Sequence, residues 1–188
     1  MILLEKNLYG IEISEQISRA AKMNMIIHDD GHTNVITSDG LISDESIIAK
    51  TNNHGFKYGT FDFIITNPPF GSTIRQSEQA YLKTYQLGKK EEDWLAVAAR
   101  PQETRDGQST EVLFIEQDYK FLKEGGYLAI VLPDGILTNS TMQYVRTQIE
   151  DWFRIVAVVS MPQTAFMANG AGVKSSVLLF KEMDKERD

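Results

Sequence analysis

The sequence has no cysteine, and this absence excludes disulfides, thiolate metal sites and cysteine nucleophiles. It also lacks an apolar run of about 18 residues, the shortest stretch that would span a membrane as a helix. Residues 1–7 do not form the long apolar core of a signal peptide. Together these absences predict a cytoplasmic protein without a membrane-spanning segment.

Basic residues are outnumbered, since 19 lysines and arginines stand against 26 aspartates and glutamates, for a net charge of −7. Such an acidic chain does not hold nucleic acid by bulk electrostatic attraction alone. Apolar residues make up 42% and charged residues 24%, which is close to globular averages and excludes disorder, collagen and coiled coil. The length of 188 residues corresponds to one domain and leaves little room for a complete enzyme.

Short apolar runs alternate with amphipathic stretches along the chain. Strands are predicted at 8–13, 35–37, 61–66, 127–132, 155–160 and 173–181. Helices are predicted at 15–28, within 41–60, at 111–123 and at 140–152. This alternation predicts an α/β fold with a mostly parallel sheet covered by helices on both faces. The connection 161–172 is too short for a helical crossover, so the last two strands should be antiparallel.

The predicted helices carry local signals for their ends and faces. Ser14 and Ser140 are suited to cap the helices that follow them, and Gly125-Gly126 to end the helix before them. The inward faces should carry Ile17, Ala20, Ala21, Asn24 and Ile27 in the first helix, and Val145, Ile149 and Trp152 in the last. The carboxylates of the segment from Glu111 to Glu116 are expected to be solvated.

One domain is predicted over residues 1–181, followed by a charged tail at 182–188. Within the domain, residues 71–110 show weak periodicity and no excess of basic residues. About 40 residues of this kind inside a compact domain indicate an irregular insertion or lid.

The sharpest local signal is the run Thr66-Asn67-Pro68-Pro69-Phe70-Gly71, directly after a predicted strand. Two consecutive prolines fix two φ angles and remove two backbone donors, which leaves carbonyls and the Asn67 side chain to accept hydrogen bonds. Open parallel sheets bind ligands at the carboxyl ends of their strands. A rigid pair of acceptors beside Phe70 suits a planar amino group, with the ring stacked on it. The alternative is a stiff turn that only ends the strand.

This run resembles the (D/N/S)PP(Y/F/W) motif of S-adenosylmethionine-dependent methyltransferases that act on amino groups. The wider sequence resembles the N6-adenine DNA methyltransferases that serve as modification subunits of type I restriction–modification systems. The resemblance extends over about residues 8–181. It is carried by LYGIEIS with the helix after it, ITSDGL, FLKEGGYLAIVLPDGIL, and IVAVVSMPQTAFMANGAGVKSSVLLF.

The resemblance implies a Rossmann-like methyltransferase sheet and a role for each matching residue. Asn67, Pro68, Pro69 and Phe70 would form the catalytic motif. Glu12 would accept hydrogen bonds from the cofactor ribose, and Asp39, followed by Gly40, would meet the cofactor adenine. Ile13 and Leu41 would pack on the two sides of that ring. Without a cofactor, Glu12 is a solvent-facing acid at a strand end, Asp39 a simple Asp-Gly turn, and Ile13 and Leu41 ordinary core residues.

The implied mechanism needs no strong base. Hydrogen bonds from the adenine amino group to Asn67 and Pro68 would favour a pyramidal nitrogen with a directed lone pair, which attacks the sulfonium methyl in line. In duplex DNA the adenine must first be flipped out, and Phe70 would compensate for its lost stacking.

The family opens with a strand and a glycine-rich loop that this sequence does not contain, so a partial catalytic domain without its first strand is expected, with little activity or cofactor affinity alone. The implied partners are DNA, a specificity subunit and a restriction subunit. Alternatives are a methyltransferase acting on an RNA base or on another amino group, such as protein glutamine, and a non-catalytic interaction subunit.

Three weaker features have ordinary interpretations. His28 and His32 have the spacing of metal ligands on one helix, but the glycine and acids between them favour a helix end, so no metal site is predicted. Asp134 is expected in a turn, with a place beside the cofactor or base pocket as the alternative. Lys174 is expected at the surface, with a phosphate contact as the alternative.

Overall fold

The computed structural model describes residues 7–29, 33–75, 80–90, 103–166 and 172–183. The chain divides into two compact units, residues 1–60 and 61–188. No helix in the described ranges is long and apolar enough to cross a membrane. The domain boundaries and the lid expected from the sequence remain predictions.

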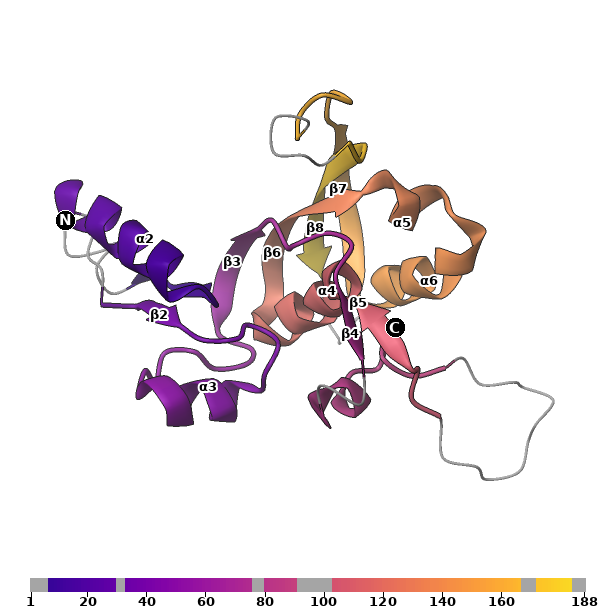
Figure 1. Ribbon diagram of the computed structural model, residues 1–188. Coiled ribbons are helices and arrows are strands. Elements are labelled where there is room, and N and C mark those ends of the chain that lie inside the picture. Colours follow the sequence, from indigo (N-terminus) through magenta and orange to yellow (C-terminus); the bar gives the residue numbers. More distant parts are fainter. Residues whose placement is uncertain (1–6, 30–32, 76–79, 91–102, 167–171, 184–188) are drawn as a thin grey trace. The chain divides into compact units, whose positions relative to one another are not determined.

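The first unit contains a two-stranded parallel sheet (Figure 1). Strand β1 (Gly10–Glu12) pairs with β2 (Val35–Thr37), followed by helix α3 (Asp44–Thr51). Helix α2 (Glu15–Ile27) lies between the strands in sequence, and the Ser14 side chain accepts a hydrogen bond from the Ile17 amide, as the capping prediction requires. The amide of Ser38 donates to the carbonyl of Glu12 at 3.0 Å, so the two strands end side by side.

The apolar face predicted for α2 is not buried within the described part of the chain. Ser18 is its one buried residue, while Ile17 is exposed and Ile27 is 75% exposed. A helix of 13 residues is about 20 Å long, whereas strands of three residues span only about 10 Å. The small sheet therefore cannot cover the face, and the prediction of an inward stripe here is wrong.

The second unit contains a four-stranded sheet in the order β3-β6-β8-β7 (Figure 1). Its strands are β3 (Phe61–Thr66), β6 (Leu122–Pro133), β7 (Phe153–Ser160) and β8 (Ser175–Glu182). Strands β3 and β6 are parallel, whereas β8 is antiparallel to both β6 and β7. The predicted antiparallel arrangement of the last two strands is confirmed.

The segment between β3 and β6 contains a second small sheet. Strands β4 (Thr73–Arg75) and β5 (Gly107–Ser109) pair antiparallel, and a 3₁₀ helix, η1 (Ala80–Thr84), follows β4 in the chain. Leu82, Tyr85 and Leu87 are buried, so this part of the predicted insertion packs into the unit. Residues 76–79 and 91–102 of the insertion lie outside the described residues.

One face of the large sheet is covered by helices α4 (Thr110–Phe121) and α6 (Gln143–Trp152). The predicted stripe of Val145, Ile149 and Trp152 is buried, as expected. On the other face Phe63 is exposed, and Ile65 is 88% exposed. The expectation of helices on both faces is wrong for the described part of this unit, because α4 and α6 both pack on the same side.

Two predicted helix ends are also wrong. Helix α4 ends at Phe121, and β6 begins at once, so Gly125-Gly126 lies within the strand. The pairing of β3 with β6 shifts register there, and Gly125 has a φ of +72°, so the glycines serve an irregular start of the strand. Ser140 begins a 3₁₀ turn, η2 (Ser140–Met142), whose cap is Asn139, and the short helix α5 (Asp134–Thr138) precedes it.

The carboxylates expected in solvent on α4 are buried. Glu116 is 3% exposed, and its two oxygens accept hydrogen bonds from the Gln86 and Leu87 amides at 2.9 and 2.8 Å. Lys120 pairs with the same carboxylate at 2.8 Å. Glu111 is also buried. The helix faces the insertion as well as the core, so its acids are covered by packed chain rather than by water.

Replacing Asp118 by Asn is expected to raise the stability of the fold at neutral pH. Burial raises the pKa of the Asp118 carboxyl well above its usual range, and no donor in the described residues reaches its Oδ2. The stability linked to this group is therefore complete below pH about 4 and is lost as the pH rises toward the folded-state pKa.

Asparagine carries no titrating proton, so the melting temperature of Asp118→Asn should exceed that of the wild type by at least about 2 °C at pH 7. The gain should shrink toward pH 4. Thermal melts of both proteins between pH 4 and 8 measure it. Equal pH dependence of the two proteins would contradict the role of this carboxyl.

Candidate functional site

The motif that follows β3 lies at the carboxyl end of that strand, as the sequence predicts. The Asn67 side chain is exposed, Pro68 is buried, and Phe70 is half-buried. Because β3 and β6 are parallel, with Thr66 opposite Ile130, the motif and the end of β6 lie at the same edge of the sheet. Within the described residues no donor is bonded to the Asn67 side chain, which is exposed, or to the carbonyl of the buried Pro68.

Thr110 fixes this turn through hydrogen bonds to its backbone. Its hydroxyl donates to the Pro69 carbonyl at 2.8 Å, and its amide donates to the Ser72 carbonyl at 3.0 Å. Thr110 is the first residue of α4 and is buried, so the core helix fixes the turn directly. Gly71 has a φ of +74°, a conformation that glycine adopts without strain and that lets the chain leave Phe70 for β4.

A second aromatic ring meets Phe70. Phe166, in the connection between β7 and β8, lies with its ring centroid 6.1 Å from that of Phe70, and the two planes are nearly perpendicular at 89°. A planar group stacked on Phe70 would therefore lie nearly perpendicular to the Phe166 ring. The sequence did not single out Thr110, because an isolated threonine before a helix gives no periodic signal, and the loop phenylalanine Phe166 was part of the family resemblance without a predicted role.

The residues predicted to bind a cofactor are in the first unit. Glu12 ends β1, and its Oε1 accepts a hydrogen bond from the Ser14 amide at 2.8 Å. Asp39 and Gly40 follow β2, and the Oδ1 of Asp39 accepts from the Leu41 amide at 2.9 Å. Because β1 and β2 are parallel neighbours, the two acids stand at one end of their sheet.

The two apolar residues predicted beside them differ in exposure. Ile13 is 72% exposed, whereas Leu41 is 3% exposed and covered by protein. Ile13 is therefore open to contact with a ligand, and Leu41 supports the loop from the interior. The bond between Asp39 and the Leu41 amide is that of an Asx turn.

The histidine pair offers no metal centre within the described residues. His28 is the C-cap of α2, and His32 lies outside the described residues. No group of three or more potential ligand side chains occurs in the described ranges.

Comparison with known proteins identifies the family. A family model described as N-6 DNA Methylase matches residues 3–188, and the chain belongs to this family. It is 25% identical over 179 residues to the Type II restriction enzyme and methyltransferase RM.BcgI of Heyndrickxia coagulans, covering 94% of this chain and 22% of that protein. It is 24% identical over 186 residues to the Type I restriction enzyme MpnII methylase subunit of Mycoplasma pneumoniae, covering 96% of this chain and 31% of that protein.

The fold is that of S-adenosylmethionine-dependent methyltransferases. The methyltransferase subunit of the type I restriction–modification system of Streptococcus thermophilus superposes with a TM-score of 0.64 at 21% identity, over 94% of this chain and 34% of that one. The Rossmann-like α/β fold class expected from the sequence is confirmed. The chain spans between a fifth and a third of the length of the curated relatives it matches.

Proposed function

We propose that this chain carries the catalytic motif and the cofactor site of an N6-adenine DNA methyltransferase within a type I restriction–modification complex. The observation that carries the proposal is the exposed Asn67 side chain next to Pro68 and the rings of Phe70 and Phe166, at the carboxyl edge of the sheet. Membership of the N-6 DNA methylase family supports the choice of DNA as substrate.

The acceptor pair suits an amino group attached to a flat ring. An adenine amino group has two hydrogens, and the Asn67 Oδ1 and the Pro68 carbonyl each accept one of them. These bonds draw the nitrogen lone pair out of the ring system and direct it away from the two acceptor oxygens. No strongly basic side chain is required, because positioning and polarisation activate the amine, and the methylated nitrogen is acidic enough to give its surplus proton to water.

The aromatic pair suits a base removed from the duplex. A flipped adenine loses its stacking on both neighbours, which costs a few kcal/mol. Phe70 offers an aromatic face for stacking, and the Phe166 ring lies beside it and nearly perpendicular to it. We therefore propose Phe70 and Phe166 as the residues that hold the flipped base.

The first unit has side chains whose chemistry suits S-adenosylmethionine. Glu12 and Asp39 present carboxylates from adjacent strand ends, which suit ribose hydroxyls and the adenine amino group, and the exposed Ile13 offers an apolar contact to the ring. When bound, this cofactor supplies a methyl group on a positively charged sulfur. Glu12 would bind and orient the cofactor through its ribose hydroxyls, and Asp39 would recognise its adenine through the amino group.

The partners follow from the function and the charge. With a net charge of −7, the chain brings little attraction for DNA phosphates. We propose that a specificity subunit supplies most DNA affinity and selects the sequence, and that a restriction subunit completes the assembly. A DNA substrate also places the protein in the cytoplasm.

The test is a methylation assay with the assembled enzyme, unmodified DNA and methyl-labelled S-adenosylmethionine. After digestion to nucleosides, the label is expected in N6-methyladenine. Parallel reactions contain RNA or protein in place of DNA. Label in N4-methylcytosine, RNA or glutamine would overturn the proposed substrate. Cofactor binding without any transfer would indicate a non-catalytic subunit.

A further inference from the structure

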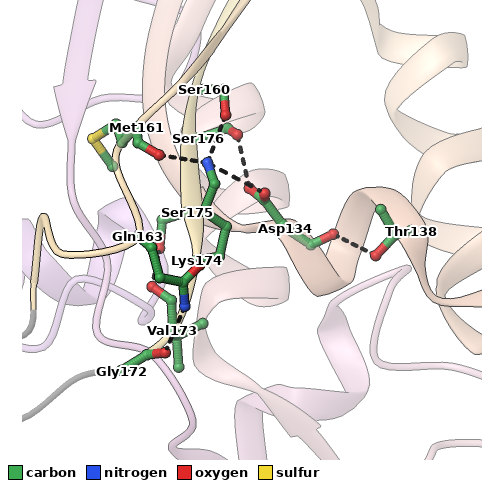
Figure 2. A network of polar contacts seen from close by, with 10 residues as sticks. All are labelled: Asp134, Thr138, Ser160, Met161, Gln163, Gly172, Val173, Lys174, Ser175 and Ser176. Carbon is green, nitrogen blue, oxygen red and sulfur yellow. Dashed lines mark hydrogen bonds and ion pairs between the residues drawn. The ribbon is translucent and has the colours of Figure 1, made fainter.

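Lys174 lies at the centre of a polar network at the same edge of the large sheet (Figure 2). Its ammonium group donates to the Ser160 hydroxyl at 2.5 Å and to the Met161 carbonyl. It also forms an ion pair with Asp134, whose Oδ2 lies 3.6 Å away. These contacts come from the ends of β6 and β7 and the residue before β8, so one side chain joins three strands of the sheet.

The contacts of the Lys174 ammonium group favour a structural role within the protein over a contact with DNA phosphate. Two of the three N–H donors of the ammonium are bonded to protein oxygens, and its charge is paired with a carboxylate. An incoming phosphate would lie beside Asp134 and be repelled by it. Lys174 is also half-buried, whereas a lysine that follows a DNA backbone keeps its charged end in solvent. The Lys174 side chain therefore stabilises contacts within the protein rather than binding DNA.

Lys174 closes the connection that carries Phe166. Met161 begins this connection and Lys174 ends it, so their hydrogen bond joins its two ends. Two further bonds support the closure: the Met161 amide donates to the Ser175 carbonyl at 3.1 Å, and the Gln163 side chain donates to the Gly172 carbonyl at 3.2 Å. The closed ends set the point from which Phe166 reaches Phe70.

Asp134 links this closure to the strand beside the motif. Its Oδ1 accepts from the Ser176 hydroxyl at 2.7 Å, and its amide donates to the Lys174 carbonyl at 2.9 Å. Asp134 follows β6 directly, and β6 pairs with β3, which leads to Asn67. The network thus joins the β7–β8 connection, which contains Phe166, to β6 and its neighbour β3, which leads to Asn67.

We propose that Lys174, paired with Asp134, is a positioning residue that fixes Phe166 against Phe70 and so sets the shape of the base pocket. The proposal rests on the proposed function for its substrate. Lys174 itself touches neither DNA nor cofactor. It acts by holding the two ends of the β7–β8 connection at one distance.

The first test compares Lys174→Met with the wild-type assembled enzyme. With 2-aminopurine at the target position, the emission that reports a flipped base should change in the variant, and kcat should fall about tenfold. The slope of DNA affinity against salt should not change. A phosphate ligand would behave differently, because its loss lowers that slope by about one. A reduced slope with unchanged kcat would overturn the proposal.

Two further variants serve as controls. Lys123→Met removes a comparable ion pair, with Asp62, from the opposite end of the same sheet, and it should leave kcat and the emission unchanged. Lys174→Arg keeps the charge, and it should recover part of the activity. Equal effects of Lys174→Met and Lys123→Met would show a general loss of stability and overturn the proposal.

A second test needs no methyl transfer. Chymotrypsin cleavage after Phe166 under native conditions should be several-fold faster in Lys174→Met than in the wild type, with Lys123→Met unchanged. Mass spectrometry of the fragments identifies the site. If the wild type transfers no methyl to adenine, the proposed function fails while this measurement still decides the positioning role. Unchanged cleavage would overturn it.

Discussion

Replacing Asn67 by Ala is expected to abolish methyl transfer to adenine, with kcat reduced at least about 10³-fold. The substitution removes the side-chain oxygen that we propose accepts one amino hydrogen, so the nitrogen lone pair should stay delocalised in the ring. Cofactor affinity should remain nearly intact, because the cofactor residues are proposed in the first unit. The measurements are single-turnover methylation of DNA and calorimetric binding of S-adenosylmethionine.

Two further variants serve as controls for this result. Ser72→Ala shortens an exposed side chain in the same turn and should leave turnover unchanged, since only its backbone carbonyl bonds to Thr110. Asn67→Asp keeps an acceptor oxygen at the same place and should retain more activity than Asn67→Ala. Turnover retained in Asn67→Ala would refute the role assigned to the motif.

The second large effect is expected from Glu116→Ala, which should destabilise the second unit by about 3 kcal/mol. The change leaves the Gln86 and Leu87 amides without their acceptors and Lys120 without its partner. The expected fall in melting temperature is about 10 °C. Differential scanning calorimetry of the assembled protein measures it.

Glu150→Ala is the matched control, because Glu150 is an exposed glutamate on α6. Its melting temperature should stay within about 1 °C of the wild type, as for most surface substitutions. Two equal melting temperatures for the Glu116 and Glu150 variants would show that the buried carboxylate contributes nothing. A fall confined to Glu116→Ala would confirm that it anchors the insertion to α4.

Much of the second unit was predictable from local pattern. The run FDFIIT has the apolar and β-branched content of a strand and is bounded by Pro68, and β3 begins and ends where predicted. The short connection between the last two strands required an antiparallel pair, and β7 and β8 pair in that way. The motif lies at the carboxyl end of β3 because Pro68 and Pro69 follow directly and stop the strand.

The contacts that fix the site were not predictable in the same way. Glu116 is a polar residue on a helix, and its sequence neighbours do not show that the Gln86 and Leu87 amides will cover it. Thr110 and Phe166 act through partners about 40 and 96 positions away. Such pairings depend on tertiary packing, which a periodic pattern along the chain does not record.

The hydrogen bonds between Thr110 and the turn of residues 67–72 affect the free-energy cost of binding at this turn. The turn loses its hydrogen bonds to Thr110 only if the first turn of α4 unravels, and that helix packs on the core sheet. The amide of Thr110 should therefore exchange with solvent hydrogen as slowly as the core does. The backbone of the turn is therefore ordered before any ligand binds, and under the proposed function an incoming base would lose little binding energy to ordering this backbone.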